Sequence, residues 1–317
     1  MALEHTLRRI SGILARVNTH PEYSTCVVGE KNAALRNEAA RHSSELERTD
    51  ETTGRRNGRR EKRLSQSETL KNLNDAWNYL SLEGIDTLTL GKLGKILEPN
   101  NNRSSGFRTI DVGFGGFHPP LSTEVLQEVD SLVWDLKNHE VHPVIRATHA
   151  HLEMVRIHPY EDGNGRAARL LQNFALQERG YPIPVIPASD RGIYIDLIHH
   201  VLADRYEHKS NIFQPSSSEN SFRNYIASKV LASAEELELE LQKRRIYDVG
   251  ISGADTPGVV HTVARVIRDY GRREGNQGIS VTVDKANSNR KGNGLHIVGD
   301  IGLRDLSASL ESLSEKY

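Results

Sequence analysis

Apolar residues recur at helical spacing between residues 68 and 247, and this pattern limits the fold more than any other feature of the sequence. From residue 68 to 82 they fall on Leu70, Leu73, Trp77 and Leu80, close to the i, i+3, i+7 positions that share one face of a helix. The sequence therefore predicts a mainly α-helical fold. Further helices are predicted over residues 31–47, 88–97, 122–138, 144–156, 166–179, 190–208 and 221–247.

The segment from Gly106 to Pro120 departs from helical spacing. Residues 109–112 (TIDV) alternate, and glycines at 113, 115 and 116 permit a tight reversal, so we expect a small β-hairpin. Ser122 follows the two prolines at 119 and 120 and is the predicted N-cap of the next helix.

Residues 248–317 have a different character, and we expect a small α+β appendix there. Its predicted elements are a helix over 259–273, short strands near residues 279–283 and 295–299, and a final helix from residue 303. Residues 1–67 are interpreted as an N-terminal region and residues 68–247 as the helical domain.

Charge and cysteine content exclude several classes of protein. Lys and Arg (41) nearly balance Asp and Glu (42), so the net charge of -1 gives no overall attraction to nucleic acid or to an anionic membrane. A basic run at residues 55–63 lies in a stretch with almost no apolar side chains, and both an exposed linker and a local contact with nucleic acid or an acidic partner stay open.

The single cysteine, Cys26, cannot form an internal disulfide, which suits a reducing compartment. No apolar run approaches the roughly 18 residues of a membrane span, and the first residues lack a signal-peptide pattern. We therefore expect a cytoplasmic protein that does not enter a membrane.

The densest chemical signal is HPYEDGNGRAAR, residues 158–169, between two predicted helices. Gly163, Asn164 and Gly165 open directly into a helix, which exposes backbone N–H groups and the positive helix end to an anion such as phosphate. Arg166 and Arg169 lie three residues apart, so both project from one face and can hold further phosphate groups.

Two more residues of this segment complete a reactive site. Asp162 is the carboxylate placed to hold a Mg²⁺ ion between phosphate oxygens, with Glu161 as a weaker second. A neutral imidazole at His158 can accept a proton from an attacking hydroxyl. Together these residues indicate phosphoryl or nucleotidyl transfer. No HExxH spacing occurs, and His149 and His151 diverge on their helix, so no dedicated zinc site is expected.

HPYEDGNGRAAR resembles the signature of the Fic domain family, His-Pro-Phe-x-(Asp/Glu)-Gly-Asn-Gly-Arg-x-x-Arg, with Tyr160 in place of Phe. Upstream, HPVIRATHAHLEMVRI is similar to the helix before that signature, and GFRTIDVGFGG is similar to the family's flap hairpin. The resemblance covers about residues 31 to 215. It implies a Fic-fold helical core with a small β-hairpin flap.

Most Fic enzymes with the full signature transfer AMP from ATP to a Ser, Thr or Tyr hydroxyl of a target protein. The resemblance thus implies ATP as co-substrate, Mg²⁺ as cofactor, a protein target and automodification. Its implied residue roles are the general base (His158), the Mg²⁺ ligand (Asp162), the α- and β-phosphate contacts (Gly163, Asn164, Gly165), the β-phosphate ligand (Arg166) and the γ-phosphate ligand (Arg169).

Two further parts of the site follow from the resemblance. Tyr194, in a segment similar to the family's Arg-x-x-Tyr, is either a nucleoside contact or a core tyrosine. The flap is expected to bind an extended target segment by adding a strand, through Ile110, Asp111, Val112 and Gly113.

Many family members carry an inhibitory helix with Ser/Thr-x-x-x-Glu-Gly/Asn, whose Glu pairs with the second arginine of the signature. Ser43 with Glu47 has this spacing within a predicted inhibitory helix at residues 31–48, and Ser307 with Glu311 is the alternative. Arg48 replaces the expected Gly or Asn, and an ordinary solvated helix end stays open for the first pair.

Two classes of function remain. The first is an AMP transferase restrained by Glu47. The second is a regulatory or toxin-type Fic protein that acts by binding nucleotide or uses another nucleotide or phosphate-containing donor.

Overall fold

The computed structural model describes residues 2–19, 21–48, 64–102, 106–207, 212–243, 245–250, 280–284 and 294–299. They divide into two compact units, the first formed by Met1–Arg16 and Lys31–Glu235, the second by Val17–Glu30 and Glu236–Tyr317. The three boundaries between the units fall within the three helices of residues 2–17, 21–48 and 217–243.

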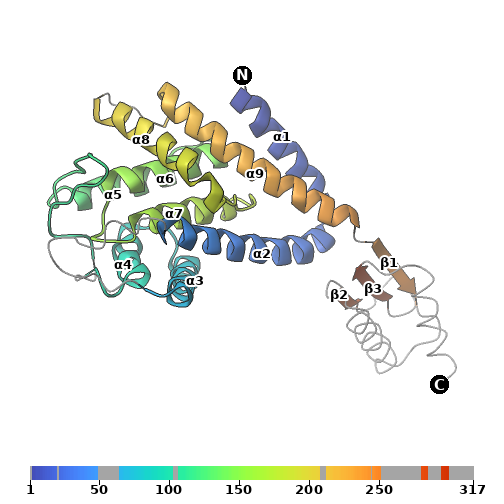
Figure 1. Cartoon of the computed structure of the whole chain (residues 1–317). Helices are drawn as coiled ribbons and strands as arrows, with labels where there is room; N and C mark the ends of the chain where they lie inside the picture. The colour runs from blue at the N-terminus through green and yellow to red at the C-terminus, as the bar shows by residue number, and fades with distance from the viewer. Residues whose placement is uncertain are drawn as a thin grey trace. The chain divides into compact units, whose positions relative to one another are not determined.

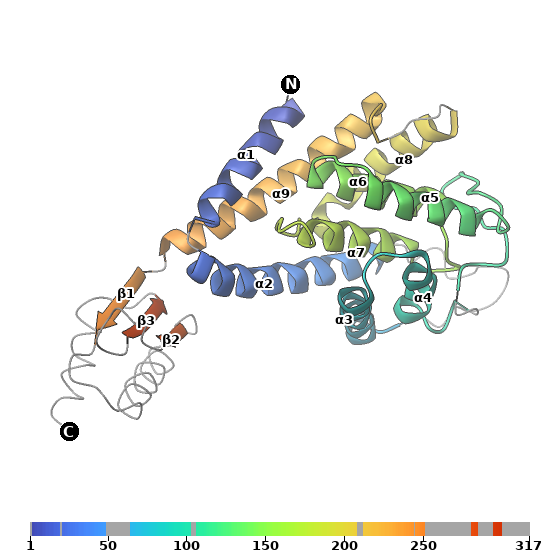
Figure 2. The same cartoon turned by 180° about the vertical axis from the view of Figure 1, so that it is seen from behind.

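The first unit is built from helices, as predicted (Figures 1 and 2). The helices that contribute to it are α1 (Ala2–Val17), α2 (Pro21–Arg48), α3 (Gln66–Glu83), α4 (Thr87–Leu97), α5 (Val125–Asn138), α6 (Pro143–Ile157), α7 (Asn164–Gln177), the 3₁₀ turn η2 (Ala188–Asp190), α8 (Arg191–Glu207) and α9 (Ser217–Lys243).

Two differences from the sequence-based helices lie at the N-terminus. The helix α1 had not been predicted, although its Leu7, Ile10 and Leu14 are buried at the i, i+3, i+7 spacing of a core-facing helix. The helix α2 begins ahead of the predicted residue 31, because the preceding residues also adopt helical structure despite Gly29.

The helices α6 and α7 form the centre of the first unit. Small fully buried side chains, Ala147 and Ala150 on α6 and Ala167 and Ala175 on α7, allow the two backbones to approach closely. The helices α3 and α4 pack on α7, and α5 packs on α6. The loop that joins α6 to α7 carries the chemical motif, so it is held at both ends by the packed centre of the unit.

The predicted hairpin is a tight reversal with a single β-bridge, between Phe114 and Phe117, in place of two paired strands. Gly115 and Gly116 turn the chain with φ of 54° and 85°. The arms do not pair further because the buried guanidinium of Arg108 donates to carbonyl oxygens in both, those of Ile110 and Pro120.

Ser122 is not the N-cap of the next helix. The helix α5 begins at Val125, and its N-cap residue Glu124 makes no side-chain capping bond. The backbone N–H of Ser122 instead donates to Asp111 Oδ1 at 2.7 Å, which fastens the reversal to the start of α5.

The second unit contains a three-stranded antiparallel sheet of β1 (Arg245–Gly250), β2 (Ser280–Asp284) and β3 (Gly294–Gly299) in the order β1-β3-β2. The strands β2 and β3 match the predicted ones. The helix predicted to reach residue 247 ends at Lys243, since the alternating RIYDV that follows suits a strand. The predicted helices at 259–273 and from residue 303 lie outside the described residues.

Across the described residues, the helices include none with the combined length and apolar character of a membrane span.

Gly94 in α4 leaves space for the ring of Tyr160, and a Cβ there would lie 2.3 Å from Tyr160 Cδ1. We therefore expect Gly94→Ala to lower the free energy of unfolding by about 1 to 3 kcal/mol through overpacking. Gly91→Ala in the same helix is the matched control, because its Cβ would meet Phe107 at an ordinary 3.8 Å. Thermal unfolding of both variants checks this, and equal melting temperatures would show that the ring adapts freely.

Candidate active site

The loop between α6 and α7 starts at a strained residue. His158 ends α6 in the left-handed region, with φ 50° and ψ 57°, and is the one non-glycine residue with positive φ among those described. Such a conformation costs roughly 1 to 2 kcal/mol and persists where the surroundings hold it. Arg108 supplies that hold: its Nε donates to the His158 carbonyl at 2.8 Å, and its backbone N–H donates to the Pro159 carbonyl at 2.9 Å.

The imidazole of His158 has an identifiable tautomer. Its Nδ1 lies 3.3 Å from the carbonyl oxygen of Val155, which can only accept a hydrogen bond. We therefore assign the ring proton to Nδ1, which leaves the lone pair of the neutral ring on Nε2. The ring of Phe114 lies parallel to the imidazole, with centroids 4.0 Å apart.

Asn164 and Tyr160 shape the loop from inside. The backbone N–H of Tyr160 donates to Asn164 Oδ1, and Asn164 Nδ2 donates back to the Tyr160 carbonyl, both at 2.9 Å. The Tyr160 hydroxyl, which a Phe would lack, donates to the Leu90 carbonyl at 2.6 Å. The side chain of Asn164 is thus committed to the loop itself, and Gly163 at φ 84° lets α7 start at Asn164.

Asp162 is held by two neighbouring asparagines, Asn101 and Asn102. Its Oδ2 accepts from Asn101 Nδ2 at 2.6 Å, and its backbone N–H and C=O both bond to the Asn102 side chain. The described residues contain no group of three His, Cys, Asp or Glu side chains that could hold a metal. One partly exposed carboxylate nevertheless suits Mg²⁺, which commonly takes one or two protein carboxylates and its remaining oxygens from phosphates and water.

Arg166 is buried against Glu98, a residue that the sequence analysis missed. Arg166 Nη1 lies 2.6 Å from Glu98 Oε1, and both side chains are only 6% exposed. Burial raises the pKa of Glu98 in spite of the charge of Arg166. The first arginine of the motif is therefore already paired with a carboxylate from the end of α4.

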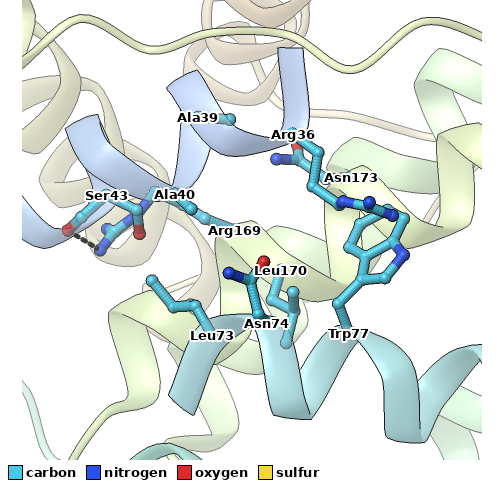
Figure 3. A pocket seen from close by; sticks show the side chains of 10 residues that line it. All are labelled: Arg36, Ala39, Ala40, Ser43, Leu73, Asn74, Trp77, Arg169, Leu170 and Asn173. Atoms are coloured by element: carbon cyan, nitrogen blue, oxygen red, sulfur yellow. Dashed lines mark hydrogen bonds between the residues drawn. The ribbon is translucent and has the colours of Figure 1, made fainter. Parts of the chain in front are cut away.

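Arg169 is paired with the helix that the sequence suggested as inhibitory. Arg169 Nη2 lies 2.7 Å from Glu47 Oε1. Arg169 Nε also donates to Ser43 Oγ at 2.8 Å, and Figure 3 shows these two side chains together. A Cβ on Gly165 would lie 2.6 Å from the same Glu47 oxygen, so that carboxylate sits over the first turn of α7. Burial would raise the pKa of Glu47, but Arg169 and Arg166 outweigh it and lower that pKa, which keeps the group ionised.

A cavity of about 30 Å³ lies beside this pair, between α2, α3 and α7. Figure 3 shows it between Arg36 and Ser43 of α2, Trp77 of α3 and Arg169 of α7. Its volume suits one or two water molecules at most. The three helices are thus packed closely around Arg169.

Tyr194 lies behind Arg169 in the core. Its side chain is 1% exposed, and its hydroxyl lies 3.3 Å from Arg169 Nη1 and 2.9 Å from His151 Nε2. Burial and the nearby Arg169 lower the pKa of His151 to about 3, so this histidine is neutral. Gln172 Oε1 is positioned to accept from His151 Nδ1, and the resulting chain lets Arg169 donate to Tyr194 and Tyr194 donate to His151. Tyr194 is thus buried in the core, where its hydroxyl contacts Arg169.

The C-terminal part of α2 is held by the 3₁₀ turn η2 and by the first residue of α8. Arg191 Nε donates to the Leu46 carbonyl at 3.0 Å, and the backbone N–H of Ala188 approaches His42 Nδ1 at 3.3 Å. These contacts place Glu47 over α7, and the sequence carried no signal for either of them.

The expected docking residues lie on the reversal next to His158. Ile110 is 53% exposed, and Asp111 and Gly113 are also exposed. Val112 is half-buried between them. The edge of this segment is thus accessible beside the motif loop.

Removal of the Glu98 carboxylate should destabilise the fold, because Arg166 would stay buried without this partner. We expect Glu98→Ala to lower the free energy of unfolding by about 3 kcal/mol, because Arg166 would keep its charge without its close counter-ion. Glu98→Gln keeps an acceptor oxygen for Arg166 and should lose less. Denaturant unfolding of both variants measures this, and a Glu98→Ala variant as stable as the parent would show that the pair contributes nothing net.

Comparison with known proteins places this site in a family. Residues 66–176 match the family model described as Fic/DOC family. The chain is 34% identical over 119 residues to Protein adenylyltransferase Fic of Drosophila mojavensis, covering 37% of this chain and 23% of that protein. It is 36% identical over 96 residues to Protein adenylyltransferase fic-1 of Caenorhabditis elegans, covering 29% and 19% respectively. The chain therefore matches about a fifth of the length of these curated relatives.

Solved structures agree on the fold. A Fic domain containing signaling protein from Bacteroides thetaiotaomicron aligns with a TM-score of 0.59 at 22% identity, covering 74% of this chain and 96% of that one. A Fic family protein from Desulfovibrio desulfuricans aligns with a TM-score of 0.55 at 17% identity, covering 96% and 97%. The match over residues 66–176 therefore identifies a Fic/DOC family domain within this chain, and the solved structures share its fold.

Proposed function

We propose that this chain transfers AMP from ATP to a hydroxyl group of a target protein, and that Glu47 restrains the reaction. The observation that carries the proposal is that the loop after α6 begins with His158 and leads directly into α7, whose first two turns carry Arg166 and Arg169. The names of the curated relatives, protein adenylyltransferases, support the same reaction.

The anion site suits the phosphate chain of ATP. The N–H groups at the start of α7 and the two arginines provide positive charge where the β- and γ-phosphates would lie. Asp162 would hold Mg²⁺, which neutralises phosphate charge when it is bound. The carboxylate of Glu47 lies over Gly165, which supports an anion site at the start of this helix.

His158 would accept the proton of the target hydroxyl at Nε2. The hydroxyl oxygen forms a bond to the α-phosphorus while the bond from that phosphorus to the oxygen bridging the α- and β-phosphates breaks, so pyrophosphate leaves and AMP is esterified to the target. The proton that the hydroxyl loses is taken up by the ring, whose Nδ1 proton is held toward Val155.

The reversal at residues 109–116 would present the target. An extended segment of the target pairs with its exposed edge by main-chain hydrogen bonds, which orients a hydroxyl without a strict sequence requirement. The chain's own exposed hydroxyl residues are further acceptors, so automodification is part of the proposal. The proposed compartment is the cytoplasm, which the single Cys26 supports.

A nucleotide-binding protein without transfer activity is the second candidate. Both motif arginines are already paired with carboxylates, Arg166 with Glu98 and Arg169 with Glu47, and this favours a restrained site. Incubation with ATP labelled at the α-phosphate separates the two candidates, because only the enzyme leaves label covalently on protein.

His158→Ala should abolish transfer and leave ATP affinity nearly unchanged, because the ring acts on the hydroxyl and not on the phosphates. Loss of a general base typically lowers the rate by a factor of about 10² to 10⁴. Proteins with His158 and with Ala at this position are best compared in a Glu47→Gly background. Calorimetry then gives the ATP affinity, and the α-label gives the rate of transfer. If the protein with both Glu47→Gly and His158→Ala transferred AMP as fast as the Glu47→Gly protein, this histidine would be excluded as the base.

Glu47→Gly should raise the transfer rate about tenfold by freeing Arg169 for the γ-phosphate. A hydrogen bond between charged groups contributes roughly 1.5 to 3 kcal/mol, and the lower figure applies because the Glu47 side chain is 39% exposed. Automodification rates measure the effect.

Glu45→Gly is the matched control, since Glu45 lies on the same turn of α2 but pairs with Arg41 and His42. Glu47→Gly combined with Arg169→Ala should stay inactive. Activation by Glu311→Gly alone would place the restraint in the C-terminal candidate Ser307–Glu311 and not in α2.

Val112→Pro should reduce transfer to protein targets more than it reduces ATP affinity. Proline removes the backbone N–H of residue 112 from the edge offered to a target strand. Target labelling and calorimetry provide the two measurements, and an equal loss in both would mean that the segment only supports the fold.

A further inference from the structure

A tight turn brings an aromatic ring flat against the candidate base. The ring of Phe114 and the imidazole of His158 lie 4.0 Å apart between centroids, with 16° between their planes. Backbone hydrogen bonds between Phe114 and Phe117, of 3.2 and 2.8 Å, close the turn that carries the ring. The contact is thus made by a constrained part of the chain.

The turn is also anchored on α8, away from His158. Phe117 stacks against Tyr206 at 5.5 Å and 15°, and meets His199 edge-on at 5.5 Å. Gly115 approaches the same histidine so closely that a Cβ would lie 3.0 Å from His199 Nε2. Contacts with α8 therefore hold the turn that carries Phe114, in addition to the contact between Phe114 and His158.

His158 needs such a support more than an ordinary helical residue would. Its backbone is in the left-handed region, and the hydrogen bonds from Arg108 hold the carbonyl groups of the loop. Rotation of a histidine ring about its last side-chain bond is broad and roughly two-fold. The bond from Nδ1 to Val155 is long at 3.3 Å, so it defines the ring plane only loosely.

We propose that Phe114 is a positioning residue that fixes the plane of the His158 ring through its flat aromatic surface. The Nε2 lone pair lies in that plane, so a fixed plane directs the lone pair to one place for the incoming hydroxyl. The structural part of this inference stands on geometry alone, and its catalytic consequence rests on the proposed AMP transfer.

Two variants separate a flat aromatic contact from simple filling of space. Phe114→Leu keeps an apolar side chain of similar volume but removes the planar surface, and Phe114→Tyr keeps the ring. Phe114 contacts the candidate base, whereas Arg166 and Arg169 would bind the phosphates of ATP. Neither change should therefore alter the affinity for ATP. Both variants are made in the Glu47→Gly background.

The first measurement is steady-state transfer. Aromatic pairs contribute roughly 0.5 to 1.5 kcal/mol beyond area burial, so Phe114→Leu should lower kcat about two- to tenfold while KM for ATP stays within about twofold. Phe114→Tyr should restore the parent kcat. The second measurement needs no activity: NMR of protein with isotope-labelled histidine should show the His158 ring signals displaced in Phe114→Leu and parent-like in Phe114→Tyr, because a stacked ring shields the protons beneath it.

The result that overturns the inference is a Phe114→Leu protein with parent kcat and unmoved His158 signals. A parallel loss of kcat, ATP affinity and thermal stability would also overturn it, since that pattern belongs to a structural residue. A Glu47→Gly parent that transfers no AMP at all would instead contradict the proposed function, and the NMR signals would then decide the positioning role by themselves.

Discussion

The close packing of α6 against α7 is the constraint on which the rest of the site depends. Both helices carry fully buried alanines and pack against each other, and the loop from His158 to Gly163 joins them. That requirement explains the left-handed His158, the glycine before α7 and the reciprocal bonds between Tyr160 and Asn164. The chemistry of the motif is therefore a consequence of where two buried helices end.

The positive charges of the two motif arginines are balanced by carboxylates of the same chain. Glu98 pairs with Arg166, and Glu47 pairs with Arg169, so each motif arginine has a carboxylate partner from a different helix. The two pairs differ in burial: the Glu98 side chain is 6% exposed, whereas that of Glu47 is 39% exposed. Of the two carboxylates, Glu47 is therefore the more accessible, as the restraint proposed for it requires.

Much of the helical fold could be predicted, because apolar periodicity and the Gly, Pro and capping residues at helix ends are local signals. The motif loop could also be predicted, since its residues are consecutive in the sequence and all suit a site for phosphate transfer. The pairing of Glu98 with Arg166 and the bonds from Asn101 and Asn102 to Asp162 were missed, because each joins segments that are distant in sequence and consist of ordinary polar residues. The hairpin prediction failed in part for a related reason. The buried Arg108 donates hydrogen bonds to a carbonyl oxygen in each arm, and pairing of the two strands would have needed those oxygens.

The most direct test of the account is the intact mass of the Glu47→Gly protein, and of lysate proteins incubated with it, after exposure to ATP and Mg²⁺. The account predicts an added AMP on protein that is absent when His158 is also replaced by Ala. Saturable ATP binding by the Glu47→Gly protein with no AMP adduct on any protein would contradict it.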